Sequence, residues 1–342
     1  MWLRDIWYFA LASRELGVGR MLHKTILGRP VLFGRTAAGE PFAFEDICPH
    51  RGIPLSHGRF DGCEVECCYH GWRFDKGGTC TVIPSLVEGQ NFNLDRVKVR
   101  SFALRESRGC LWIWHGDATA EDKTLPAPPE IPTLGDSDLH IAETLSFPCE
   151  IDHAVVGLMD PAHGPFVHQS WWWRSRRSMH EKAKEFAPAE QGFKMVRHTP
   201  SSNSFAYKLL GGAPETEILF RLPGVRIEHI TTSKYTVVGL TAVTPLRAGE
   251  TEINHLIFWD VPWLTPFAPA LRAFACRFLR QDRDVVALQQ EGLAYEPSLM
   301  LINDSDTQAR WYYQLKREWE RASEDGRPFM NPIRPRTLRW RS

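Results

Sequence analysis

Two cysteines and two histidines near residue 60 have spacings typical of metal ligands. Cys48 and His50 are separated by one residue, and after sixteen intervening residues come Cys67 and His70, which are separated by two. Two thiolates and two imidazoles suit a zinc ion, and they equally suit a 2Fe-2S centre in which thiolates hold one iron and imidazoles hold the other. The spacing therefore predicts a metal site and leaves both metals open.

A second group of polar side chains lies in the pattern D-x2-H-x4-H, formed by Asp160, His163 and His168. On an unbroken helix the two histidines would point about 140° apart. Gly164 and Pro165 lie between them, and proline disfavours helical geometry at the residue before it. The backbone can therefore turn and bring both imidazoles to one point. Taken alone, such a pair is more often structural.

Asp282 is the candidate third ligand, because it interrupts the apolar stripe of a predicted helix. A carboxylate that faces a core is costly unless it is paired or metal-bound, whereas Asp284 falls among polar residues and is expected to be solvated. Two histidines and one carboxylate form the ligand set of a mononuclear ferrous site with open positions. The stripe contains Leu271, Phe274, Ala275, Phe278, Leu279, Val285 and Val286.

With both groups considered together, the sequence resembles the Rieske non-haem iron oxygenases, the catalytic subunits of ring-hydroxylating systems and O-demethylases. The likeness covers nearly the whole chain, with strong motifs at residues 48–72 and 160–168 and a weaker one at Gln281 and Asp282. It favours a 2Fe-2S cluster over zinc. Rieske proteins of respiratory complexes carry an extra cysteine in each loop, but residues 52–56 contain none. The oxygenase branch, near vanillate demethylase and pheophorbide a oxygenase, is therefore the better match.

The resemblance implies a terminal oxygenase with two cofactors, a 2Fe-2S cluster on Cys48, His50, Cys67 and His70 and a mononuclear ferrous iron on His163, His168 and Asp282. It also implies a homotrimer in which the cluster of one subunit lies near the iron of the next. Asp160 matches the aspartate that bridges the two metal sites, and a catalytic role is expected for it.

Electrons are expected from NADH or NADPH through a separate ferredoxin or flavoprotein reductase, because no convincing G-x-G-x-x-G motif follows a strand. The expected reaction is hydroxylation or oxidative demethylation of a small hydrophobic substrate, aromatic or polycyclic, with molecular oxygen. Cis-dihydroxylation is the alternative. An electron-transfer Rieske protein without its own chemistry and a zinc-stabilised binding protein are the rival classes. Trp171, Trp172 and Trp173 suit either a pocket or an interface, and residues 267–279 suit subunit packing or a peripheral membrane contact.

The elements around these motifs predict an α+β protein with two domains. Residues 1–118 read as short strands separated by turns, which predicts an all-β Rieske domain. Residues 119–342 read as an α+β catalytic domain, with an antiparallel sheet flanked by helices, a first helix near residues 150–159 and a longer one around residues 271–286. The proline-rich segment 125–132 is a plausible linker.

Composition restricts the other classes of function. The 342 residues hold 41 Lys plus Arg and 41 Asp plus Glu, so net charge gives no reason to expect binding to nucleic acid. Residues 1–10 make a poor signal peptide, and three cysteines crowd near a histidine instead of being spread as in a disulfide framework. A cytoplasmic location is therefore expected.

Overall fold

The computed structural model describes residues 2–119, 122, 124–132, 139–168, 176–199 and 213–342. The chain forms two compact units, Trp2–Glu130 and Ile131–Ser342. They meet inside the proline-rich segment that we expected as a linker. The assignment of residues 1–118 and 119–342 to two functional domains stays a prediction.

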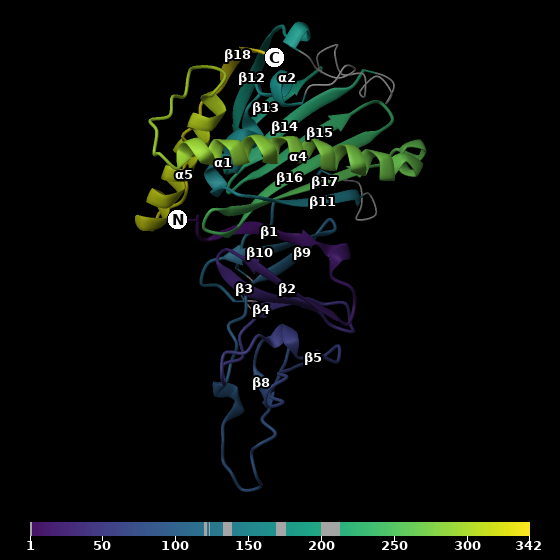
Figure 1. The fold of residues 1–342 in the computed structure, drawn as a ribbon, viewed down its shortest axis with the longest axis vertical. Coiled ribbons are helices and arrows are strands. Elements are labelled where there is room, and N and C mark those ends of the chain that lie inside the picture. The colour runs from purple at the N-terminus through teal and green to yellow at the C-terminus, as the bar shows by residue number, and fades with distance from the viewer. Residues whose placement is uncertain (1, 120–121, 123, 133–138, 169–175, 200–212) are drawn as a thin grey trace. The chain divides into compact units, whose positions relative to one another are not determined.

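The N-terminal unit consists of three small antiparallel sheets (Figure 1). The short strands that the sequence predicted within residues 1–118 are present. The first sheet has the order β1-β10-β9, the second β2-β3-β4 and the third β5-β6-β7-β8. Their bounds are β1 Ile6–Ala12, β2 Arg20–Ile26, β3 Arg29–Arg35, β4 Pro41–Glu45, β5 Arg59–Phe60, β6 Val65–Glu66, β7 Arg73–Phe74, β8 Cys80–Val82, β9 Leu104–Ser107 and β10 Cys110–His115.

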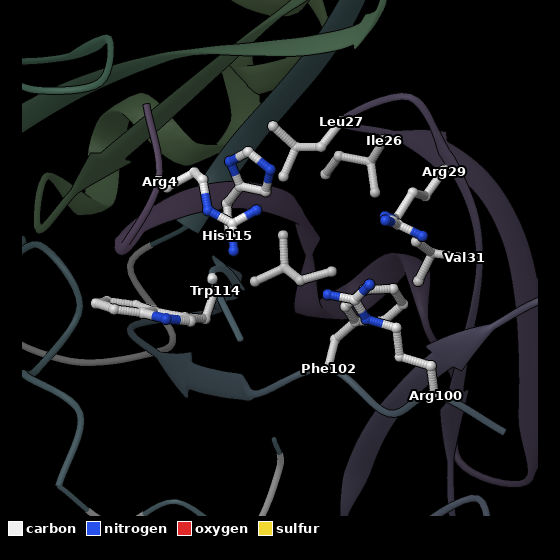
Figure 2. A pocket seen from close by; sticks show the side chains of 11 residues that line it. Arg4, Ile26, Leu27, Arg29, Val31, Arg100, Phe102, Trp114 and His115 are labelled. Carbon is white, nitrogen blue, oxygen red and sulfur yellow. The ribbon is translucent and has the colours of Figure 1, made fainter. Parts of the chain in front are cut away.

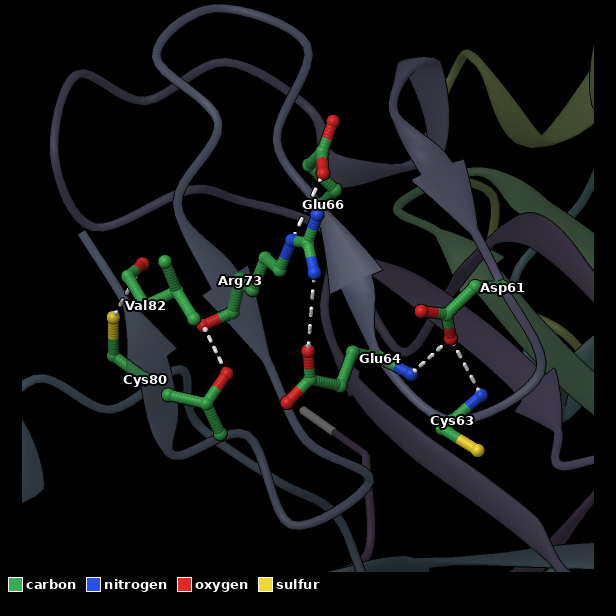
Figure 3. Close-up of polar contacts among 8 residues, drawn as sticks. Asp61, Cys63, Glu64, Glu66, Arg73, Cys80 and Val82 are labelled. Carbon is green, nitrogen blue, oxygen red and sulfur yellow. Dashed lines mark hydrogen bonds and ion pairs between the residues drawn. The ribbon is translucent and has the colours of Figure 1, made fainter. Parts of the chain in front are cut away.

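The third sheet carries one of the two predicted cluster loops, between β6 and β7. Across this hairpin, Arg73 binds the carboxylate of Glu66 at 2.9 Å and lies 3.9 Å from Glu64 (Figure 3). At the preceding turn, Asp61 accepts hydrogen bonds from the backbone N–H groups of Cys63 and Glu64, both at 2.8 Å. Aspartate favours such turns because its side chain replaces a backbone acceptor. The ion pair between Arg73 and Glu66 therefore holds the base of the loop between β6 and β7, and Asp61 stabilises the turn at the other end of β6.

A small pocket in the N-terminal unit lies among arginines and apolar side chains from β2, β3 and β10 (Figure 2). Arg4 binds Asp117 at 2.7 Å, and Arg29 binds Glu45 at 2.8 Å. The third arginine of the lining, Arg100, lies 3.9 Å from Asp117, so all three cations are near carboxylates and we assign the pocket no function.

The C-terminal unit is built on one antiparallel sheet of eight strands, in the order β11-β17-β16-β15-β14-β13-β12-β18. Successive strands from β12 to β17 are neighbours, so hairpin connections build most of the sheet. The expected α+β fold with an antiparallel sheet is confirmed. The bounds are β11 Leu139–Phe147, β12 Glu181–Ala189, β13 Gly192–His198, β14 Glu215–Arg221, β15 Val225–Thr231, β16 Thr236–Arg247, β17 Glu250–Trp259 and β18 Arg336–Arg341.

Helices pack against this sheet, and the longest of them lies across its strands (Figure 1). They are α1 Ile151–Met159, α2 Gly164–Val167, α4 Ala268–Leu293 and α5 Thr307–Glu324. Helix α1 is held to α5 through Asp152, which accepts hydrogen bonds from Tyr312 at 2.6 Å and from Lys316 at 2.8 Å. In the described part of the chain, no helix is long and apolar enough to cross a membrane.

The apolar stripe predicted for α4 is narrower than expected. Ala275, Leu279 and Val286 are buried, but Phe274 and Val285 are 39% and 46% exposed. The prediction was wrong for these two residues because only a narrow face of the helix is covered within this chain. Asp284 is exposed, as expected.

Candidate metal centres

The first predicted cluster loop is closed by two backbone hydrogen bonds around Cys48. The Cys48 N–H donates to the carbonyl of Ile53 at 2.8 Å, and the Gly52 N–H donates to the carbonyl of Cys48 at 2.8 Å. Gly52 has φ +74°, a left-handed conformation that glycine adopts without steric penalty. The glycine therefore closes the loop that presents Cys48 and His50.

The second loop repeats this construction around Cys67. The Cys67 N–H donates to the carbonyl of Trp72 at 2.8 Å, and the Gly71 N–H donates to the carbonyl of Cys67 at 3.0 Å. Gly71 has φ +71°. The shared Cys-x3-Gly spacing is the sequence signal for two equivalent loops. It accounts for the glycines that follow His50 and His70.

The two loops place their cysteines next to each other and their histidines next to each other. Cys48 and Cys67 are 1% and 2% exposed, and their thiols contact each other. The rings of His50 and His70 have centroids 4.4 Å apart. A cluster in which thiolates bind one iron and imidazoles bind the other requires this separation of the two ligand types.

Two observations test whether these residues fit a metal cluster. Nδ1 of His50 is buried and has no hydrogen-bond partner among the described residues, while Trp72 stacks on the ring at 4.4 Å and fixes its orientation. Burial, followed by contact with Cys67, raises the pKa of Cys48 to about 11. A buried thiolate pair needs a positive partner, and a buried nitrogen without one needs a ligand. The side chains of the two loops therefore fit a 2Fe-2S cluster.

In the C-terminal unit, the structure brings His163, His168 and Asp282 together. Nε2 of His168 lies 3.1 Å from Nε2 of His163 and 3.1 Å from Oδ1 of Asp282. The remaining distance, between His163 Nε2 and Asp282 Oδ1, is 3.6 Å. Ligands about 2.1 Å from one metal and at right angles to each other are about 3 Å apart. The three atoms are therefore spaced like one face of an octahedral site.

The backbone turns between α1 and α2, which places the histidines. Helix α1 ends at Met159, and Asp160 is extended, with φ −65° and ψ 117°. Oδ1 of Asp160 accepts the backbone N–H of Ala162 at 2.7 Å, which stabilises the turn. His163 then precedes the short helix α2, which Pro165 helps to begin, and His168 follows it.

Three residues of helix α4 contact the ring of His168 and orient it. Phe278 stacks on the imidazole with a centroid distance of 3.4 Å. Oε1 of Gln281 lies 3.1 Å from Nδ1, and Asp282 approaches the other nitrogen. The amide oxygen accepts a hydrogen bond from the Nδ1–H group, which leaves the lone pair of Nε2 directed at the other two ligands.

Asp160 lies beside His163, although it is not within hydrogen-bond distance. Its Oδ2 is 3.6 Å from Nδ1 of His163, and that nitrogen is buried with no hydrogen bond among the described residues. Burial lowers the pKa of His163, but attraction to Asp160 and then to Asp282 outweighs burial and raises it. The bridging role expected for Asp160 stays a prediction.

The sequence-based prediction included Gln281 in a weak motif and Phe278 in an apolar stripe, but it assigned neither of them a contact with His168. Phe278 lies three residues before Gln281 and four before Asp282, which places it beside both on the helix surface, and this spacing was the available signal. Trp171, Trp172 and Trp173 lie outside the described residues.

Comparison with known proteins supports the first centre directly. Residues 6–102 match the family model of the Rieske [2Fe-2S] domain. Chlorophyllide a oxygenase of Chlamydomonas reinhardtii is 34% identical over 175 residues, which is 50% of this chain and 25% of that protein. The oxygenase component of dicamba O-demethylase from Stenotrophomonas maltophilia is 34% identical over 172 residues, 49% of this chain and 48% of that protein.

Residues 6–102 therefore form a Rieske [2Fe-2S] domain, and the relatives that the chain resembles include oxygenases. The resemblance noted from the motifs is thereby confirmed. The crystal structure of dicamba monooxygenase bound to dicamba has a TM-score of 0.75 and 23% identity, and the match covers 94% of this chain and 98% of that one. At this identity the likeness shows a shared fold. The sequence matches span less than half of the length of these two relatives, so the activity of this chain is argued from its own site.

Proposed function

We propose that this protein is a terminal oxygenase component, which uses molecular oxygen and externally supplied electrons to hydroxylate or oxidatively demethylate a hydrophobic substrate. The observation that carries the proposal is the convergence of His163, His168 and Asp282, whose ligand atoms all lie within 4.8 Å of one another. A Rieske protein that only transfers electrons needs the cluster loops and has no use for this second set.

The residues of the second centre would hold an iron in different ways, three as ligands and two by orienting the histidines. Ferrous iron bound there would supply oxygen activation, and the Rieske cluster would supply electrons. The three ligand atoms occupy one side, which leaves the opposite side for oxygen and substrate. Gln281 keeps Nδ1 of His168 protonated, and the negative charge of Asp160 faces the second nitrogen of His163.

A separate redox partner is part of the proposal. The sequence contains no convincing dinucleotide-binding motif, and the demethylase relative is itself named as an oxygenase component. We expect a ferredoxin, a flavoprotein reductase or both to deliver electrons that originate from NADH or NADPH. Cluster reduction by NADH or NADPH should therefore require an added reductase, and direct reduction of the purified chain by either nucleotide would contradict this part.

The proposed assembly is a homotrimer in which Asp160 links the iron site of one subunit to the cluster of the next. Exposed apolar side chains along α4 and the turn before it, Phe267, Phe274 and Leu288 among them, form a surface that subunit packing would cover. Light scattering on the purified protein measures the mass directly. A monomer at micromolar concentration would rule out a bridge between subunits.

The proposed substrate is aromatic or polycyclic. One relative is named for chlorophyllide a and another for dicamba. Both names denote reactions on ring-bearing molecules, which supports a hydrophobic substrate of this kind.

Metal and sulfide analysis of anaerobically purified protein tests the proposal. The oxygenase should contain about three irons and about two acid-labile sulfides per chain, since the cluster accounts for two irons and the second centre for one. A protein that only transfers electrons would hold the cluster irons alone, and a zinc-stabilised binding protein would hold zinc without sulfide. Either result would refute the oxygenase assignment.

A further inference from the structure

The two cluster loops are built alike, except at the position two residues before each first cysteine ligand. In the second loop this position is Val65, which is fully buried in an apolar cluster that also contains Cys48 and Cys67. In the first loop it is Asp46, whose side chain is 0% exposed. Burying a carboxylate is costly unless it is hydrogen-bonded, whereas burying a valine is favourable. The loop construction therefore works with an apolar residue here, and the carboxylate calls for a separate reason.

Asp46 uses both carboxylate oxygens to hold the far end of the first loop. Its Oδ1 accepts the backbone N–H of Ser56 at 2.7 Å, and its Oδ2 accepts the Ser56 hydroxyl at 2.6 Å. Ser56 lies in the 3-10 turn Leu55–His57, which follows the loop. These two hydrogen bonds join the ends of the segment 46–56, which contains both ligands of the first loop. The ligands are thereby held from both sides.

Asp46 also ties the loop to two neighbouring strands. Nδ1 of His23, on β2, lies 2.6 Å from Oδ2 of Asp46, and the His23 side chain is 45% exposed. The backbone N–H of Asp46 donates to the carbonyl of Pro30, on β3, at 2.9 Å. Asp46 therefore fixes the point at which the ligand loop leaves the sheet β2-β3-β4.

The charge of Asp46 would act on the cluster in addition to its hydrogen bonds. Residues two apart in a chain have Cα atoms at most about 7 Å apart, so Asp46 lies close to the iron that Cys48 would bind. A negative charge disfavours the reduced cluster, which carries one more electron, and solvent screens this charge little because the side chain is buried. Asp46 should therefore lower the reduction potential.

We propose that Asp46 is a positioning residue of the Rieske centre, which locks the first ligand loop through Ser56 and lowers the reduction potential of the cluster. Asp46 itself ligates neither metal. The inference goes beyond the proposed oxygenase function, because it concerns the cluster alone and holds whether or not the second centre binds iron.

The reduction potential of the cluster-loaded chain, measured by a redox titration that is followed in the visible spectrum, tests the role of the charge. Asp46→Asn keeps the size and can still hydrogen-bond Ser56, but it removes the charge. Its potential should rise by an amount that corresponds to about tenfold in the equilibrium constant of reduction, or about 59 mV for one electron. Asp61→Asn is the matched control, because Asp61 is exposed and also accepts hydrogen bonds in a turn of this domain. Its potential should stay as in the wild type.

Release of iron to a chelator tests the role of the hydrogen bonds. Ser56→Ala keeps the charge of Asp46 and removes the hydroxyl that donates to it, so the potential should not rise. The loop should open more often, and the protein should lose its cluster to EDTA about fivefold faster, as expected for the loss of one hydrogen bond. Ser85→Ala is the control, because Ser85 is exposed in the same domain, and it should lose the cluster at the wild-type rate.

The outcomes distinguish this inference from the proposed function. A potential that is unchanged in Asp46→Asn, an equal rise in Asp61→Asn, or a wild-type rate of cluster loss in Ser56→Ala would overturn the inference. If Asp46→Asn takes up no cluster, the rate of cluster loss in Ser56→Ala decides. None of these results bears on the second centre, whose iron is measured separately by metal analysis.

Discussion

Replacing Gln281 by leucine should weaken iron binding at the second centre without disturbing the cluster. The side chain of His168 is 2% exposed, and Oε1 of Gln281 accepts a hydrogen bond from its Nδ1–H group at 3.1 Å. Without that acceptor, the free imidazole can place its proton on Nε2, where Asp282 accepts it at 3.1 Å. Iron binding would then have to move the proton back to a buried nitrogen that has lost its partner.

The magnitude follows from that lost partner. An unsatisfied buried donor costs about 1–3 kcal/mol, and outer partners of metal-bound histidines typically contribute 10–100-fold in affinity. The dissociation constant for ferrous iron should therefore rise by about 10–100-fold in Gln281→Leu. Gln281→Glu keeps an acceptor at this position and should recover most of the affinity.

The assay is an anaerobic titration of iron-depleted protein with ferrous iron against a competing chelator, with the visible spectrum of the cluster as an internal reference. Gln289→Leu is the matched control, because Gln289 is exposed on the same helix. If Gln281→Leu binds iron as tightly as Gln289→Leu, the amide does not orient His168 and the reasoning fails.

Three further predictions concern carboxylates. Asp282→Ala should lose the mononuclear iron and keep the cluster spectrum, whereas the exposed Asp284 should tolerate alanine; the reverse result in metal analysis would mean that the wrong carboxylate was chosen. Asp160→Asn should keep both metals and the trimer, yet slow cluster reoxidation in a single turnover by orders of magnitude, and a wild-type rate would make it an ordinary turn residue. Burial raises the pKa of Glu106, but its hydrogen bonds and ion pair with Arg35 outweigh burial and lower it. The interaction with Arg35 therefore stabilises the folded protein at pH values above the pKa that Glu106 has in the unfolded chain. This stabilisation is lost as the pH falls and the carboxylate becomes protonated. The melting temperature of Glu106→Gln should therefore lie below that of the wild type at pH 7 and approach it below roughly pH 4, and a difference that persists at low pH would contradict the ion-pair account.

The residues of both candidate metal centres could be proposed from the sequence alone. The Cys-x-His and Cys-x2-His spacings predicted the cluster loops, because a ligand pair so close in sequence must share one turn of backbone. The Gly164-Pro165 step predicted that the helix would break between the histidines, because proline restricts the residue before it. Asp282 was found because its charge interrupts an apolar stripe. Each of these features lies within a few residues.

The features that only the tertiary structure decided join distant segments. Gln281 reaches His168 across 113 residues, and no periodicity in either segment indicates that pairing. The contact between Thr241 and His255 on adjacent strands depends on strand register, since a shift by one residue would turn every side chain to the other face. Phe274 and Val285 matched the apolar pattern of α4 and are nevertheless exposed. Periodicity identifies which side chains can share a face, but packing against the rest of the chain decides how wide the covered part of that face is.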